Sequence, residues 1–215
     1  MSAKHCGHHH RGHHHDERYK LNRRILCGII VFIVLVLFVI FLVWAILHPT
    51  KPRFILQDAT VYAFNVSTSP PFTISTSMQV TVSSRNRMDR VGIYYQKLNI
   101  YATYRSQQVT LQTLLPPTYQ GHKEVSVWSP FLYGNSVPIW PRLMEALQQD
   151  QNIGSVLFKI KIDGTIKWKV GTWFSGRYHL HVNCPAYIKF GDRNNGFPVG
   201  PVMKFQLVQG CNVDV

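Results

Sequence analysis

The stretch Val156–Val170, VLFKIKIDGTIKWKV, alternates apolar and polar residues through most of its length. Most of its apolar side chains stand at even positions, with lysines between them. A period of two is typical of a β-strand with one buried face. Asp163-Gly164 divides the stretch, and an Asp-Gly pair between alternating runs favours a two-residue hairpin, in which both central residues need positive φ. We therefore predict two antiparallel strands joined at Asp163-Gly164.

Alternating runs on both sides of this stretch extend the pattern. Further strands are predicted at about 54–65, 78–83, 97–104, 107–114, 123–128, 176–190 and 202–209. One helix fits residues 140–149, because Pro141 stands at its start and Leu143, Ala146 and Leu147 fall on one face. Many half-polar antiparallel strands favour a β-sandwich, so we predict one all-β domain with a short helix over residues 54–215.

The segment before this domain has a different character. Residues 25–47 form a run of 23 uncharged residues, of which 19 are Ile, Leu, Val or Phe. A helix of that length reaches about 35 Å, which is enough to cross a hydrocarbon core of about 30 Å. A cleavable signal peptide would have a shorter apolar region and a small-residue cleavage site. We predict a single transmembrane helix over 25–47 and a stiff, proline-containing linker over 48–53.

The charges that flank the span predict its orientation. Arg18, Lys20, Arg23 and Arg24 precede it, whereas Lys51 and Arg53 follow it. The positive-inside rule therefore places the N-terminus in the cytosol and exports the β domain. Residues 1–24 form a His-rich basic tail that we expect to be disordered. Cys6 and Cys27 are candidate acylation sites because cysteines close to a span are common acceptors.

The formal net charge of +13 divides between the two sides of the membrane. The tail carries +4 and the rest of the chain +9. A basic protein invites a nucleic-acid interpretation, but an exported domain lies on the wrong side of the membrane for it. Anionic lipid or acidic polysaccharide suits the domain better, and a basic surface that serves only solubility is an equal alternative.

Two cysteines fall in the exported domain, where disulfides persist. Cys184 shares strand parity with Leu180 and Val182, and Cys211 shares parity with the strand predicted before it. Both side chains are then expected to point into the core. Either they form a disulfide or they remain two buried free thiols.

From the apolar span onward, the order and spacing of short motifs resemble the plant proteins named for non-race-specific disease resistance and harpin induction, the NDR/HIN-like proteins with a late-embryogenesis-abundant type 2 (LEA-2) domain. The motifs that carry the resemblance are 48–54 (HPTKPRF), 63–67 (AFNVS), 85–86 (RN), 92–95 (GIYY), 117–123 (PTYQGHK), 168–171 (WKVG) and 182–184 (VNC). Many members have Asn-Pro-Asn where this chain has Asn86-Arg87-Met88. That turn must be built differently here.

The resemblance implies a fibronectin-like sandwich, residence in the plasma membrane and a part in defence or stress responses. It implies no catalytic residue and no cofactor. The leading functional prediction is a non-enzymatic module that binds an unknown protein or cell-wall partner outside the cell. The alternative is a lipid-binding or lipid-transfer domain held beside the membrane.

Few residues suggest chemistry of their own. Asn65 begins an Asn-Val-Ser sequon on the exported side and is a predicted glycosylation site. His179 and His181 lie two apart on one strand face, where they are either surface histidines or the beginning of a weak metal site without an identifiable third ligand.

Aromatic residues gather in the proline-rich region between two predicted elements. They are Trp128, Phe131, Tyr133 and Trp140. They either line an apolar groove, as a lipid-binding domain would need, or fasten the predicted helix onto the sheet.

Overall fold

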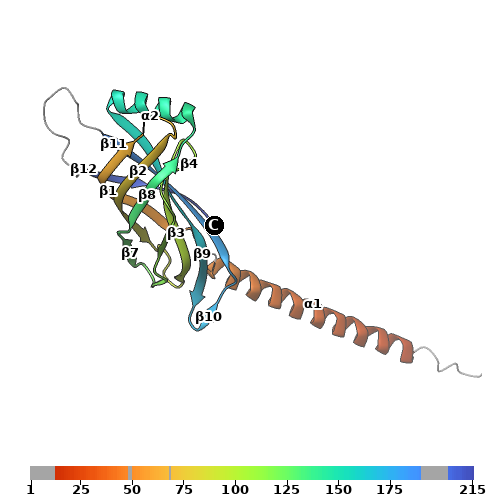
Figure 1. Cartoon of the computed structure of the whole chain (residues 1–215). Helices are drawn as coiled ribbons and strands as arrows, with labels where there is room; N and C mark the ends of the chain where they lie inside the picture. Colours follow the sequence, from red (N-terminus) through yellow and green to blue (C-terminus); the bar gives the residue numbers. More distant parts are fainter. Residues whose placement is uncertain (1–12, 48–49, 68, 190–202) are drawn as a thin grey trace, which may run out of the picture. The chain divides into compact units, whose positions relative to one another are not determined.

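The computed structural model describes residues 13–47, 50–67, 69–189 and 203–215. The chain divides into two compact units, Met1–His48 and Pro49–Val215. The described part of the first unit is a single helix, α1 (His13–Leu47), and the second unit contains every strand together with helix α2 (Pro141–Ile153) (Figure 1).

Helix α1 is longer than the predicted span. It begins at His13, twelve residues before Ile25, so the expectation of a disordered tail is wrong for residues 13–24. Residues 13–24 contain neither Gly nor Pro, and extending a helix that has already formed costs little. The window Arg23–Leu42 has a mean hydropathy of 3.6 and buries none of its surface in the protein. By length and composition, α1 is able to cross a membrane. Residues 1–12, with Cys6, lie outside the described residues.

The second unit is built from two antiparallel sheets. The first sheet contains β1 (Arg53–Val66), β2 (Thr73–Arg85), β7 (Val125–Trp128), β8 (Phe131–Pro138) and β12 (Met203–Gly210). The second contains β3 (Gly92–Tyr104), β4 (Gln107–Gln108), β5 (Thr113–Leu115), β6 (Thr118–Gln120), β9 (Ser155–Val170), β10 (Trp173–Phe174), β11 (Tyr178–Lys189) and β13 (Asn212–Asp214). The first is ordered β12–β1–β2–β7, with β8 also beside β2, and the second β13–β11–β9–β3–β4.

The core lies between the two sheets. Phe54 of β1 meets the ring of Tyr95 on β3 edge to face, with centroids 6.3 Å apart, and stacks on Trp128 at 6.4 Å. Phe64 of β1 contacts Phe158 of β9 at 5.9 Å. These aromatic contacts join the inner faces of the two sheets, as is typical of a sandwich. The predicted antiparallel β architecture is confirmed.

The hairpin predicted at Asp163-Gly164 is wrong. Strand β9 runs unbroken through both residues, with β3 on one side and β11 on the other. A Cβ on Gly164 would overlap the Lys97 carbonyl oxygen, so this glycine admits the backbone of β3 rather than forming a turn. The alternation could not distinguish the two structures, because even-numbered residues face the core on both sides of Gly164 in either case.

The hairpin that closes this part of the sheet comes seven residues later. Val170 pairs with Trp173 across Gly171-Thr172, and Gly171 adopts a φ of +58°. Glycine takes a positive φ at the first central position of a two-residue turn without steric cost. The turn therefore depends on Gly171.

The structure differs from the local predictions at three other places. The helix predicted at 140–149 is α2, which extends to Ile153 and ends at Gly154 in the left-handed conformation. Strand β8 was not predicted, since Pro130 precedes it and Pro138 is its last residue, and a stretch bounded by prolines is typical of a loop. The run expected at 107–114 divides into the short strands β4 and β5.

The turn that departs from the family pattern is built around Asn86. Its side chain is fully buried, its Nδ2 donates to the carbonyl oxygens of Val91 (2.8 Å) and Gly121 (2.9 Å), and its Oδ1 accepts from the Met88 N–H (3.0 Å). Three hydrogen bonds of the Asn86 side chain thus hold the loop between β2 and β3, and the departure from the family pattern is confined to Arg87-Met88.

We expect Asn86→Ala to lower the free energy of unfolding by about 2–3 kcal/mol, because it leaves buried backbone groups without partners. Denaturant unfolding of the full chain in detergent, followed by tryptophan fluorescence, measures this change. Asn135→Ala, at an exposed position of β8, is the control and should change stability by less than about 0.5 kcal/mol. Equal losses in the two variants would contradict the structural role of Asn86.

Candidate functional site: a basic aromatic end of the domain

One end of the β domain collects segments that are far apart in the sequence. Arg53, at the start of β1, pairs with Arg85 at the end of β2, and Gly92, at the start of β3, pairs with Lys169 near the end of β9. The backbone N–H of Asn86 also donates to the Glu124 carbonyl oxygen, which brings in the loop before β7. Strand pairing therefore places this loop and the β9–β10 turn at the same end of the domain.

The β9–β10 turn presents two adjacent aromatic residues to solvent. The side chain of Trp173 is 63% exposed and that of Phe174 is 46% exposed. The Ser175 N–H donates to the Trp168 carbonyl oxygen, and the Ser175 hydroxyl accepts from the Trp168 N–H, so the hairpin continues beyond β10. The turn is thus a well-bonded support for two exposed rings.

Lysine and aromatic rings alternate across the neighbouring strands. The Lys169 ammonium lies 4.9 Å from the centroid of the Tyr119 ring and 5.3 Å from that of Phe174. Tyr94 meets Phe174 edge to face at 6.5 Å. A Cβ on Gly92 would lie 2.9 Å from Cε2 of Tyr119, so the glycine gives that ring its place on the sheet. The result is a cationic surface with apolar rings embedded in it.

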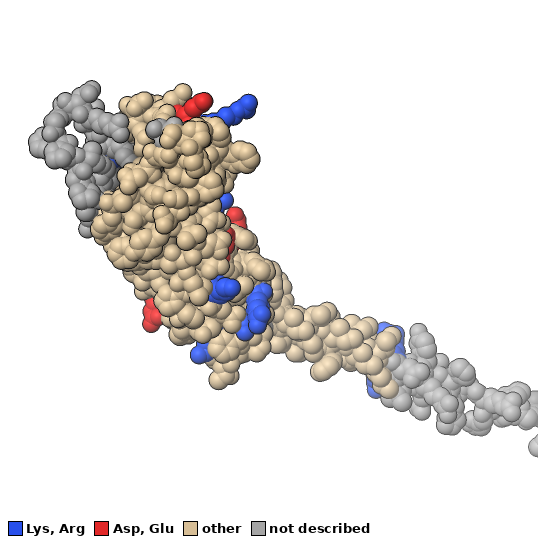
Figure 2. All heavy atoms as spheres, viewed as in Figure 1, with Lys and Arg blue, Asp and Glu red and all other residues tan. Residues whose placement is uncertain are grey.

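Positive charge dominates this end of the domain, which we call the basic end. Its nine basic residues are Lys51, Arg53, Arg85, Arg87, Arg90, Lys123, Lys167, Lys169 and Arg177, and its three acidic residues are Asp89, Glu124 and Asp214. Two of the acidic groups are already paired, Asp214 with Lys51 at 3.0 Å and Asp89 with Lys123 at 2.6 Å. In the view of Figure 2, most of the surface carries no charge.

The second sheet also holds one polar cluster on its outer face. Asp163 accepts a hydrogen bond from the Tyr101 hydroxyl at 2.6 Å, and its other oxygen lies 2.7 Å from Nδ1 of His181. Burial and the bond to Asp163 raise the pKa of Tyr101 to about 12, so the phenol stays protonated and donates. His179 lies on the same face but outside this cluster. Among the described residues, no group of three ligands that could hold a metal includes either histidine.

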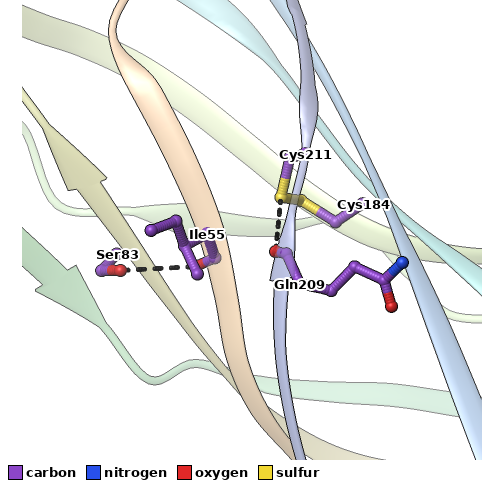
Figure 3. Close-up of a disulfide and its surroundings, with 5 residues drawn as sticks. All are labelled: Ile55, Ser83, Cys184, Gln209 and Cys211. Carbon is purple, nitrogen blue, oxygen red and sulfur yellow. Dashed lines mark hydrogen bonds between the residues drawn. A yellow bond between two sulfur atoms is a disulfide. The ribbon is translucent and has the colours of Figure 1, made fainter.

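The two cysteines of the domain are joined in the structure. Cys184 on the buried side of β11 bonds to Cys211, at the corner where the chain leaves β12 in the first sheet for β13 in the second (Figure 3). Cys184 is fully buried, whereas Cys211 is half-buried. The bridge therefore ties the two sheets together at their shared corner.

Two predicted modification sites are accessible. Asn65 is exposed near the end of β1, and Cys27 is an exposed free thiol within α1. An exposed side chain is what a modifying enzyme requires, so glycosylation of Asn65 and acylation of Cys27 stay predictions.

The four aromatic residues predicted as a groove or a staple do not lie together. Trp128 is 6% exposed and belongs to the core, whereas Phe131 and Tyr133 stack on the outer face of β8 at 6.0 Å. Trp140 is 71% exposed at the start of α2, so its ring does not pack the helix against the sheet. Both interpretations are wrong, because alternation along β7 and β8 sends neighbouring rings to opposite faces. An internal lipid groove loses the observation that motivated it.

Sequence reasoning missed the basic end as a site. Its local signal is Lys167–Arg177, KWKVGTWFSGR, where an aromatic pair follows a glycine turn and basic residues stand on both sides. The remaining charges come from β1, β2 and the loops, and only strand pairing brings them to the same end.

Comparison with known proteins identifies the family. The family described as "LEA_2: Late embryogenesis abundant protein" matches residues 81–185. "NDR1/HIN1-like protein 1" of Arabidopsis thaliana is 54% identical over 93% of this chain and 96% of its own length. "NDR1/HIN1-like protein 12" of the same plant is 54% identical over the whole of both chains, and "NDR1/HIN1-like protein 26" is 43% identical over 72% of this chain and 73% of its own. A β-sandwich that follows an apolar helix in the sequence agrees with the resemblance described above. The chain belongs to the NDR1/HIN1-like proteins with a LEA_2 domain.

Proposed function

We propose that this chain is a non-enzymatic, single-pass plasma-membrane protein whose β domain lies outside the cell and acts as a binding module in plant defence or stress responses. The observation that carries the proposal is the direct succession of a helix able to span a bilayer and a complete β domain with a strongly charged end. Membership of the NDR1/HIN1-like proteins supports the defence or stress setting. The partner is a protein, a cell-wall component or a lipid surface, and nucleic acid is not among the candidates.

Proximity labelling in intact plant cells tests this function. A peroxidase fused after Val215, supplied with a membrane-impermeant substrate, should label surface proteins, and the set of labelled neighbours should change when an immune elicitor is added. The matched control carries the peroxidase before Met1, and we expect no labelling from it until the membrane is opened. Labelling by the N-terminal fusion alone would reverse the orientation, and an unchanged set of neighbours would remove the link to defence.

Glycosylation gives the same experiment an independent readout. If the domain enters the secretory pathway, Asn65 should carry a glycan, and treatment with a glycosidase should increase the gel mobility of the chain. Asn65→Gln should remove that shift without altering the labelling pattern. A chain that labels outside but has no shift would show that Asn65 is not used, and the orientation would still stand.

A further inference from the structure

We propose that the basic end docks onto the surface of an anionic bilayer, so that the β domain rests against the membrane by its β9–β10 turn. This inference rests on the proposed function in one respect, which is that α1 spans a membrane. Beyond the proposed function, it names the surface of the domain that contacts lipid. It also names the kind of lipid, which is one whose headgroups carry net negative charge.

Charge complementarity is the first argument. The basic end carries nine Lys and Arg side chains against three Asp and Glu, and two of those three acids already face a lysine. Among the described residues, Lys167, Lys169 and Arg177 form no ion pair, and the Lys169 ammonium lies over the rings of Tyr119 and Phe174. Basic side chains beside an anionic surface are each worth about fivefold in binding. The basic end is therefore attracted to phosphate headgroups.

The exposed aromatic residues fit the interface of a bilayer. Trp173 and Phe174 belong to the turn next to Lys169, and both keep a substantial exposed surface, which is the larger for Trp173. Indole and phenyl rings gain free energy at the boundary between headgroups and acyl chains, where Trp is enriched in membrane proteins. An acidic polysaccharide would also neutralise the lysines, and its sugar rings can stack on an exposed indole. The bilayer is favoured over it because only residues 48–52 separate this domain from a helix able to span a membrane. A bilayer surface satisfies both features.

The short linker between α1 and β1 lowers the entropic cost of such docking. Only residues 48–52 separate the end of α1 from the start of β1, and an extended chain of that length reaches about 20 Å. Arg53 itself is part of the basic end. A surface held so close to a spanning helix meets the bilayer at a high effective concentration, so weak contacts suffice for docking.

Quenching of Trp173 by brominated lipid tests the proposal. The full chain is reconstituted into bilayer discs of phosphatidylcholine brominated near the headgroup, with or without about 30% phosphatidylserine, a fraction that gives a strongly negative surface. The contribution of Trp173 is the difference in fluorescence between the wild type and Trp173→Phe. We expect this contribution to be quenched in the anionic discs, and much less in the neutral discs or at high salt.

Two variants with the same loss of charge locate the effect. The tip variant, Lys167→Gln/Lys169→Gln/Arg177→Gln, should reduce the docking equilibrium by about 100-fold and abolish the quenching. The control variant, Lys159→Gln/Lys161→Gln/Lys189→Gln, removes three charges from the same sheet away from the turn and should retain it. Circular dichroism checks that both variants are folded, and Lys167→Arg/Lys169→Arg should keep both the charge and the quenching.

Several outcomes would overturn the inference. Equal loss of quenching in the tip and control variants would show that net charge alone, and not the basic end, attracts the domain. A Trp173 fluorescence that no lipid quenches would exclude contact between the turn and the bilayer. Added polygalacturonate could also bind tightly to the wild type and abolish the quenching of Trp173, while failing to bind the tip variant. That result would assign this end to acidic polysaccharide instead. Reconstitution places the chain in a bilayer whatever its destination in the cell, so failure here leaves the labelling test of the proposed function undecided.

Discussion

Gly164→Ala is expected to destabilise the domain by about 3 kcal/mol or more, which is large for the addition of one methyl group. The new Cβ would overlap the Lys97 carbonyl oxygen and lie 2.7 Å from Cδ2 of Leu98 and 2.9 Å from its Cα. Two of these three atoms belong to the backbone of β3, so no side-chain rotation relieves the overlap. Strands β3 and β9 must separate at the middle of the second sheet, where β9 is paired on both sides.

Denaturant unfolding of the full chain in detergent measures this change, with the buried Trp128 and Trp168 as reporters. Gly176→Ala is the matched control, because a Cβ there meets no atom within 4 Å and the residue does not require positive φ. Its effect should stay within about 0.5 kcal/mol. Indistinguishable midpoints for the two variants would show that the backbone of β3 does not pass close to Gly164, and would contradict the unbroken pairing of β9 at this residue.

Removal of the disulfide should have an effect of similar size. The bridge closes a loop with a sequence separation of 27 residues, and loop-closure entropy then predicts a loss of about 3.5 kcal/mol in Cys184→Ala/Cys211→Ala. For a domain of this size, that loss lowers the melting temperature by about 10 °C. The location adds to the effect, since the bridge fastens β11 of the second sheet to the corner at which the chain leaves the first.

Thermal unfolding with and without a reductant measures the contribution of the bridge. Reduction should lower the melting temperature of the wild type to that of the double variant and leave the double variant unchanged. Cys27→Ala, which removes an exposed thiol from α1, should not alter the unfolding of the β domain. A wild type insensitive to reductant would mean that the two thiols are free in solution.

Local patterns in the sequence were sufficient for much of the architecture. Alternation in Val156–Val170 predicts which residues face the core, and Phe158, Ile160 and Ile162 are fully buried as expected. The apolar run of 25–47 predicts a helix, and α1 contains all of it. Both predictions rest on periodicity, which depends on the geometry of one strand or one helix and on nothing else in the chain.

Patterns that need a neighbouring segment failed. The same alternation in β9 is consistent with a hairpin or with one long strand, and the choice depends on β3, whose backbone passes over Gly164. Trp128 and Phe131 are three residues apart and pair with Val82 and Gln79 along the same edge of β2, so alternation places one in the core and the other on the outer face. Only the pairing with β2 shows that the extended chain continues past Pro130.

The amino-acid sequence by itself thus determined the spanning-length helix, the β class of the domain and the family to which the chain belongs. Only the tertiary structure decided which turn closes β9 and where the charges gather. Arg53, Arg85 and Lys169 come from three strands, and their common end is fixed by antiparallel pairing across up to 77 residues of chain. Hydrogen bonding between strands has no signature in local periodicity, so a surface assembled by strand pairing becomes visible only in the folded domain.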